Sequence, residues 1–175
     1  MMIRNAKLSD AKKILEIIKS ANINRYSPEI TGFVELPIPS LKKIANQISE
    51  NPYFYVAEES KGVVGFLSAF TDQRLEEFQD RENLENHLLE KERPFIYWEL
   101  LGTDKKYQEQ GIGKMLSEHL LNETRNYPTL YGPISHKPHK NTVSIKLLED
   151  LGWKPSEEIN ACDGITFGIY TYKNP

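Results

Sequence analysis

The chain has 175 residues, 39% of them hydrophobic, a length and composition that predict one folded domain with its own core. The formal net charge of −3 argues against a nucleic-acid partner, and no apolar run reaches the roughly 18 residues that a membrane-spanning helix needs. Cys162 is the only cysteine, which excludes an internal disulfide, and the first residues contain no apolar core of a signal peptide. We therefore expect a soluble, cytoplasmic protein that binds neither nucleic acid nor membrane.

Apolar periodicity and punctuating residues predict the elements in chain order. Residues 8–21 carry a helical apolar stripe with Ser9 as the predicted N-cap, and residues 27–40, with three prolines and a glycine, predict a loop. The other expected elements are a strand at 3–6, a helix beginning at Ser40, a hairpin over 53–70, a strand at 94–103, a helix after Gly111, a strand at 129–135, a helix at 141–152 and two strands within 157–172 around Asp163–Gly164.

Residues 72–93 form the one compositional outlier, with 8 acidic and 4 basic residues and thus a net charge of −4. We expect a helical insert that covers a sheet, with its apolar residues turned inward. The alternative is a role in substrate recognition or in a homodimer contact, and an insert at the acceptor site would favour a cationic acceptor. The inward residues are expected to be Leu75, Phe78, Leu84, Leu88 and Leu89. The whole order predicts an α/β fold on a mixed sheet.

The stretch YQEQGIGKML, residues 107–116, places two glycines and a lysine between a strand and a helix. The first amides of a helix lack acceptors inside the helix, and the helix dipole adds partial positive charge there. With small residues at Gly111 and Gly113 and a cation at Lys114, the turn predicts a phosphate cradle. The alternative is a tight turn that needs glycine only for its backbone dihedrals.

The pattern Gln108-Glu109-Gln110-Gly111-Ile112-Gly113 resembles Q/R-x-x-G-x-G/A, the acetyl-coenzyme A pyrophosphate loop of the GNAT superfamily of N-acetyltransferases. Residues 141–153 also resemble a later helix of that family, with Asn141, Ser144, Gly152 and Trp153 at its motif positions. The element order matches the family over nearly the whole chain. The resemblance implies one domain over residues 1–175, with a mostly antiparallel central sheet flanked by helices, splayed strands and the acidic insert before the central strand.

The resemblance also implies a set of cofactor-binding residues and no metal. Acetyl-CoA would be the cosubstrate, and its pantetheine arm would enter a gap where two strands diverge. Gly132-Pro133, in the second of these strands, fits incomplete pairing because proline has no N–H. The residues implied for the cofactor are Leu101, Gly102, Thr103, Gln108, Glu109, Gln110, Gly111, Ile112, Gly113, Lys114, Asn141 and Ser144.

Acetyl transfer to an amine needs a neutral amine, and the departing thiolate benefits from a proton. Glu99, a carboxylate within an apolar strand, is the candidate base; the alternative is a structural glutamate bonded to backbone or to a tyrosine. Leu148 occupies the position at which the family often carries a proton-donating tyrosine. Tyr131, Tyr97 or a water would then replace it, or the thiolate would leave unassisted.

Other reactive side chains are assigned no chemistry. His136 and His139 are too isolated from cysteines and carboxylates to predict a metal site, and Cys162 has no activating neighbour in sequence. The favoured function is transfer of an acetyl group from acetyl-CoA to a primary amine, on a small molecule or a protein, by direct attack in a ternary complex. The alternatives are a non-catalytic acyl-CoA-binding module and a plain interaction domain.

Overall fold

The computed structural model describes residues 1–23, 31–34, 36–162 and 164–175, apart from the side chain of Cys162. Parts of the predicted loop at 27–40 and of the predicted turn at Asp163–Gly164 therefore lie outside the described residues.

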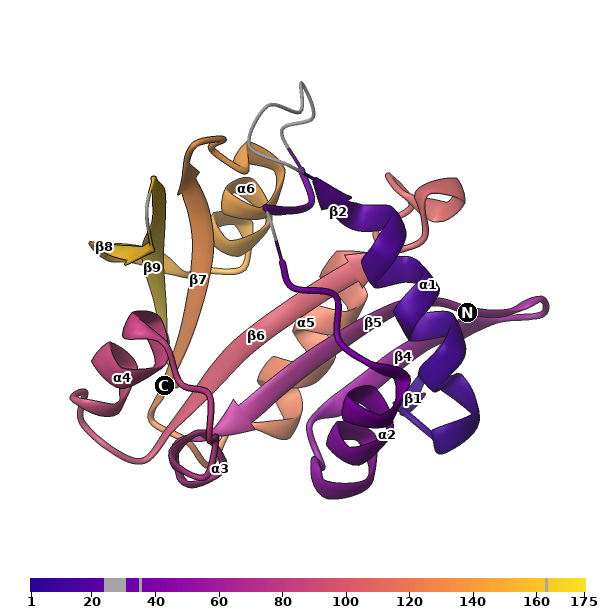
Figure 1. Ribbon diagram of the computed structural model, residues 1–175, viewed down its shortest axis with the longest axis horizontal. Helices are drawn as coiled ribbons and strands as arrows, with labels where there is room; N and C mark the ends of the chain where they lie inside the picture. The colour runs from indigo at the N-terminus through magenta and orange to yellow at the C-terminus, as the bar shows by residue number, and fades with distance from the viewer. Residues whose placement is uncertain (24–30, 35, 163) are drawn as a thin grey trace. The chain divides into compact units, whose positions relative to one another are not determined.

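The chain forms two compact units. The first comprises Met1–Ala69 and Leu100–Glu123, and the second comprises Phe70–Glu99 and Thr124–Pro175. Strands β5 (Gly62–Thr71) and β6 (Phe95–Thr103) each contribute residues to both units. The single domain expected from the sequence stays a prediction. Figure 1 labels helices and strands of both units where there is room.

The first unit is built on antiparallel strands in the order β1, β4, β5. Met2 lies opposite Glu58, and Val56 lies opposite Phe66. The elements of this unit, besides β5 and the end of β6, are β1 (Met2–Asn5), η1 (Leu8–Asp10), α1 (Ala11–Ala21), β2 (Asn22–Ile23), β3 (Phe33–Val34), α2 (Leu41–Glu50), β4 (Phe54–Glu59), η2 (Lys105–Tyr107) and α5 (Ile112–Glu123).

Helices cover both faces of these strands, because side chains alternate along a strand. Val56 and Phe66 share a buried cluster with Ile14 of α1 and Ile44 of α2. The next position along β4, Tyr55, faces the other way, and its ring meets His119 of α5 edge-on with ring centroids 4.6 Å apart. His119 of α5 thus packs against β4.

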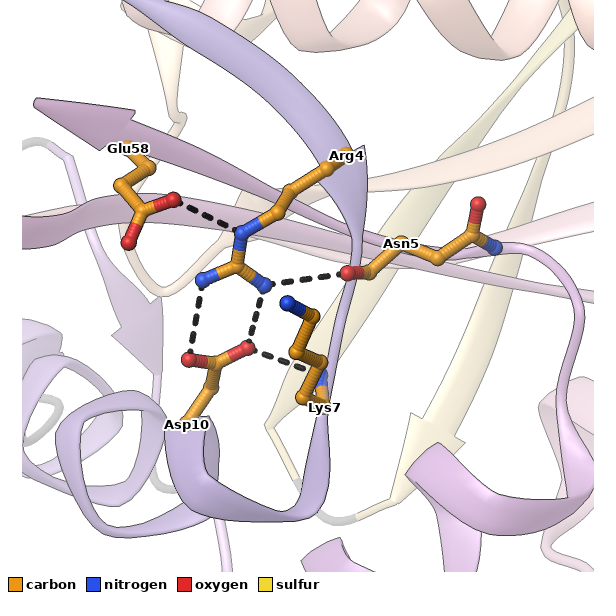
Figure 2. A network of polar contacts seen from close by, with 5 residues as sticks. All are labelled: Arg4, Asn5, Lys7, Asp10 and Glu58. Carbon is orange, nitrogen blue, oxygen red and sulfur yellow. Dashed lines mark hydrogen bonds and ion pairs between the residues drawn. The ribbon is translucent and has the colours of Figure 1, made fainter.

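Two predictions in the first unit are wrong. Ser9 does not cap α1: it lies inside η1, and Asp10 instead accepts the backbone N–H of Lys7 at 2.8 Å and holds the guanidinium of Arg4 (Figure 2). Within the predicted loop, Phe33–Val34 is a strand that pairs in parallel with Asn22–Ile23. The amide of Asn22 supports this pairing, since it donates to the carbonyl of Leu36 at 2.8 Å and accepts its N–H at 3.2 Å.

The second unit contains the strand order β6, β7, β9, β8. The β6–β7 pairing is parallel, and the β7–β9 and β8–β9 pairings are antiparallel. Taken with the first unit, the sheet is mixed and mostly antiparallel, as the sequence predicted. The further elements of this unit are α3 (Asp72–Glu76), α4 (Asn83–Leu89), β7 (Thr129–Lys137), α6 (Thr142–Asp150), β8 (Lys154–Cys162) and β9 (Ile165–Lys173).

The acidic insert is two short helices, α3 and α4. Thr71 Oγ1 caps α3 by accepting the N–H of Arg74 at 3.1 Å, and Glu82 forms a capping box with Glu85 at the start of α4. Arg81 donates to the carbonyl of Phe78 at 2.8 Å between them. The predicted inward residues are confirmed: a buried cluster on the sheet includes Leu75, Leu84 and Leu88, with Phe78 and Leu89 packed against it.

The β6–β7 ladder ends early. Its paired residues are Phe95–Tyr97 and Thr129–Tyr131, although β6 continues to Glu99 within this unit and β7 continues to Lys137. The described ladder therefore stops just before Gly132-Pro133. Proline offers no N–H to extend it, so the predicted divergence of these two strands is confirmed.

Candidate active site

The glycine-rich turn runs from the end of β6 to α5 in the first unit. Residues 108–111 are exposed, and the first backbone bond of the helix joins the N–H of Met115 to the carbonyl of Gly111 at 3.0 Å. The backbone N–H groups just before Met115 therefore have no acceptor within the helix, and they are the ones available to a ligand. Glu109 and Gly111 have positive φ angles of 62° and 77°. A Cβ at Gly111 would meet no atom within 4 Å, so the space beside it is open.

Asp104 anchors the start of this turn. Its Oδ2 lies 2.6 Å from Lys13 Nζ, its Oδ1 accepts the N–H of Lys106 at 3.1 Å, and its backbone N–H donates to Val64 of β5 at 2.9 Å. The Lys13 ammonium and the Lys106 amide lower the pKa of the Asp104 carboxyl. Sequence analysis missed this anchor because the two side chains that form it are far apart in the sequence and neither belongs to a motif.

The end of β6 and the start of α5 pack closely in the same unit. A Cβ at Gly65 would lie 2.8 Å from Ile112 Cγ2 and 3.2 Å from the carbonyl oxygen of Gly102. A Cβ at Gly102 would approach Phe66 Cε1 to 2.5 Å. These glycines let the predicted pantetheine segment Leu101–Thr103 lie beside the buried first residue of the helix. The structure thus brings this segment and the turn residues Gln108 to Lys114 together in one unit.

Glu99, Tyr131, Asn141 and Ser144 lie in the second unit. Glu99 is half-buried in β6, and alternation places it on the face of buried Tyr97. Burial raises the pKa of Tyr97, and the nearby negative charges of Glu99, Glu85 and Glu82 raise it further. Glu99 is therefore close enough to Tyr97 for its charge to act on that hydroxyl.

Asn141 is the N-cap of α6. Its Oδ1 accepts the N–H of Ser144 at 3.0 Å, and its own N–H donates to the carbonyl of Ser135 at 2.9 Å. Among the described residues, the Nδ2 amide of Asn141 has no hydrogen-bond partner, and it is therefore the part of this side chain that can donate to a ligand. The cap at the start of this helix and Gly152 at its end confirm the predicted helix bounds.

Leu148 is fully buried at the level where β6 and β7 diverge. A Cβ at Gly132 would lie 3.2 Å from Trp98, 3.2 Å from Trp153 and 3.6 Å from Leu148 Cδ1. The two tryptophan rings pack together with centroids 5.4 Å apart. Because this position is a leucine, α6 contributes no hydroxyl there.

Tyr131 lies in the paired part of β7, opposite Tyr97, and its ring meets Phe95 edge-on at 5.3 Å. Burial raises the pKa of its hydroxyl, and the charge of Lys91 partly opposes that shift.

Two histidines contact residues of distant segments. His136 lies on β7, where Nδ1 is 2.5 Å from Glu158 and Nε2 is 3.2 Å from the hydroxyl of Tyr170. His87 Nε2 lies 3.0 Å from Glu157. The side chain of Cys162 lies outside the described residues.

Two absences apply to the described ranges of the chain. No group of three or more histidine, cysteine, aspartate or glutamate side chains is arranged to hold a metal ion. None of the helices in those ranges combines the length and the apolar character required to cross a membrane.

The chemistry available follows from these settings. Exposed amides with an adjacent lysine suit a phosphate group, and a half-buried carboxylate suits proton removal from an ammonium group. The chain therefore has residues suited to two requirements of acyl transfer from a phosphorylated carrier, which are phosphate binding and proton removal.

Comparisons with known proteins identify the family and the fold. The model of the acetyltransferase (GNAT) family matches residues 15–153. An N-acetyltransferase from Staphylococcus aureus Mu50 superposes with a TM-score of 0.70 at 19% identity, over 99% of this chain and 98% of that one. The protein yncA from Salmonella typhimurium, solved with its cofactor acetyl-CoA, gives 0.69 at 16% identity, over 100% and 94%. The ribosomal-protein-S18-alanine N-acetyltransferase from Escherichia coli gives 0.65 at 17% identity, over 99% and 93%. No curated protein sequence matches the chain.

Proposed function

The chain belongs to the acetyltransferase (GNAT) family, and on that premise we propose that it transfers an acetyl group from acetyl-CoA to a primary amine by direct attack in a ternary complex. The observation that carries the proposal is the turn before α5. It is exposed, it bends through positive φ angles at Glu109 and Gly111, and it leads into a helix whose first amides are unused within the helix.

We assign the pyrophosphate of the cofactor to the backbone amides of Gln108 to Lys114. The open space beside Gly111 admits a phosphate oxygen where a side chain would block it. The Lys114 side chain is 58% exposed, and its nearest carboxylate oxygen, on Glu118, is 3.8 Å away, so its charge is available to a phosphate. Backbone groups of Leu101 to Thr103 and the free amide of Asn141 would hold the pantetheine arm, with Ser144 beside it.

The cosubstrate supplies the activated acyl group, and the chain must supply a base. We assign that role to Glu99, a half-buried carboxylate on the strand that leads into the predicted pantetheine segment. The proton donor for the thiolate is not contributed by Leu148. Tyr131 is the candidate hydroxyl in its place, although its raised pKa makes it a weak acid, and a water is the alternative.

The acceptor is proposed to be cationic. The negative charges of Glu99 and of Glu85 and Glu82 in the insert all act on Tyr97, and negative charge attracts an ammonium group. The apolar side of the insert already packs on the sheet, so an acceptor or a second copy of the chain would meet its acidic side.

The test is release of free thiol from acetyl-CoA with a panel of amines at low and at high salt. The panel contains a polyamine, free amino acids, a lysine peptide and a peptide with an N-terminal alanine. We expect release with at least one cationic amine, and a lower kcat/KM at high salt because exposed charges are screened over about 10 Å at 0.1 M. Tight acetyl-CoA binding with no release for any amine would support the alternative, an acyl-CoA-binding module without catalysis.

A further inference from the structure

A hollow of about 590 Å³ lies in the second unit, beside the ends of β7, β8 and β9 and the residues that follow α4. Small-molecule sites typically occupy about 300–1,000 Å³, so this volume suits a small ligand. It shares no residue with the glycine-rich turn. Its polar lining includes Lys91, Tyr131, Lys154, Ser156, Thr171 and Lys173.

The lining is positively charged on a chain whose net charge is −3. Three lysines face the hollow together with one carboxylate, that of Glu157, which gives a local net charge of +2. Glu157 is already engaged, because Oε1 lies 2.5 Å from Lys91 Nζ and Oε2 lies 3.0 Å from His87 Nε2. It therefore leaves the other two lysines without a counter-ion.

Lys154 and Lys173 are the two free cations. Neither ammonium forms an ion pair or a hydrogen bond with any residue in the described ranges, and they come from neighbouring strands, β8 and β9. Lys154 lies opposite Thr171 in that ladder, and Lys173 lies two residues further along β9. The two charges are thus held on adjacent strands at one end of the sheet.

The hydroxyls of the lining are fixed by one another. Thr171 Oγ1 donates to Ser156 Oγ at 3.1 Å, and Ser156 Oγ donates to the carbonyl of Ile169 at 3.0 Å. A register shift between Pro155 and Glu157 places Ser156 as an extra residue in β8, and such bulges redirect side chains. The Tyr131 hydroxyl, which is also the candidate proton donor to the thiolate, has no hydrogen-bond partner among the described residues.

The donor set indicates the class of anion. Arginine is the side chain that matches a planar carboxylate with two parallel bonds, and no arginine lines the hollow. Lysines act as point charges and suit the tetrahedral charge of a phosphate. We propose that this hollow is a second ligand site, which binds a phosphate-bearing small molecule through residues other than the glycine-rich turn.

The experiment titrates the full-length protein with pyrophosphate while amide chemical shifts are recorded. It is repeated in a Gly111→Glu variant, in which the turn before α5 carries a negative charge. We expect shifts at residues 152–157 and 171–173 in both proteins. The doubly substituted Lys154→Gln/Lys173→Gln protein should bind about tenfold more weakly, since both free charges are lost. Lys42→Gln/Lys43→Gln on α2 removes the same charge elsewhere and should change the affinity less than about twofold.

Four outcomes would overturn the site. They are shifts confined to residues 108–114, an equal loss of affinity in the α2 control, no saturable binding of pyrophosphate, and citrate bound as tightly as pyrophosphate. The first would leave only the turn as an anion site, the second would reduce the effect to net charge, and the last would assign the hollow to carboxylates. Because the Gly111→Glu protein is included, failure of acetyl-CoA binding and failure of this site give different results.

Discussion

Lys13 Nζ lies 2.6 Å from Asp104 Oδ2, and this ion pair joins α1 to the residue from which the glycine-rich turn departs. The carboxylate also caps η2 through the N–H of Lys106. We expect Lys13→Met to weaken acetyl-CoA binding about threefold to tenfold, because the turn loses one of its anchors. The free energy of unfolding should fall by no more than about 1 kcal/mol, since Lys13 is 39% exposed.

Calorimetry measures the affinity, and denaturant unfolding measures the stability. Lys12→Met, an exposed neighbour on the same helix, is the matched control and should change neither quantity. Unchanged affinity in a folded Lys13→Met protein would show that the pair has no role in positioning the turn.

The second prediction concerns the network of Arg4, Asp10 and Glu58 (Figure 2), in which Arg4 donates to Asp10 at 2.7 and 3.1 Å. Burial raises the pKa of the Asp10 carboxyl, but the bonds from Arg4 and from the Lys7 N–H lower it more, so the net pKa is below its ordinary value. A carboxyl with a lowered pKa stabilises the fold at pH values above its unfolded-state pKa of about 3.9. This stabilisation is lost as the pH falls through the folded-state pKa.

Asp10→Asn should therefore cost about 1–3 kcal/mol at neutral pH, because a buried hydrogen-bonded charge is removed. The difference from the unsubstituted protein should shrink below about pH 4. Urea unfolding from pH 3 to 7 measures both, with Glu59→Gln as a control of equal charge change in the same unit. A stability difference that stays constant from pH 3 to 7 would contradict a lowered pKa of the Asp10 carboxyl.

The third prediction tests the phosphate cradle at Gly111. Gly111→Glu places a carboxylate in the open space beside the turn, and Gly111→Gln places a neutral side chain of the same size there. Both carry the same backbone strain of about 1–2 kcal/mol, because φ is 77°. Acetyl-CoA affinity should fall in both variants and fall further in Gly111→Glu. Calorimetry that finds normal affinity in a folded Gly111→Glu protein would remove the cradle.

The fourth prediction tests Glu99 as the base. Glu99→Gln preserves size and removes proton acceptance, so kcat should fall roughly 10²- to 10⁴-fold. Acetyl-CoA affinity should change little. Glu92→Gln, exposed and within the same unit, is the control for loss of one negative charge. A normal kcat over the whole pH range would return Glu99 to the structural role that the sequence left open.

The elements with long periodic patterns were predictable, and the short ones were not. The apolar stripe after Ser40 predicts α2, and the hydroxyl of Ser40 caps it as expected, accepting the N–H of Lys43 at 3.1 Å. The two-residue strands β2 and β3 carry no periodicity, and the Asn22 amide that supports their pairing binds Leu36, a residue that is distant in sequence. The acidic insert forms two helices instead of one. Arg81 binds a backbone carbonyl after the first helix, and the capping box at Glu82 begins the second.

The site was predictable only where a motif is contiguous. The turn at 108–114 and the cap at Asn141 are local patterns, and both adopt the expected element boundaries. The Lys13–Asp104 pair and the cations Lys154 and Lys173 depend on contacts between distant segments, which leave no signal in one sequence. The assigned roles of the site residues, the homodimer and the cytoplasmic location stay predictions.

The last prediction concerns Leu148, which occupies the position of a tyrosine in the family pattern. From the sequence alone, Leu148→Tyr should raise kcat or leave it unchanged. The structure adds a cost, because Leu148 is fully buried beside Gly132 and the two tryptophans, and overpacking such a site costs about 1–3 kcal/mol. Leu148→Phe introduces a side chain of nearly the same size as tyrosine but without the hydroxyl. It should therefore lose about as much stability as Leu148→Tyr. Assayed below the lowered melting temperature, Leu148→Tyr should show a kcat at least equal to that of the unsubstituted protein and above that of Leu148→Phe. Equal kcat values for the two variants would show that a hydroxyl at this position protonates no thiolate, and the proton would then come from Tyr131 or from water.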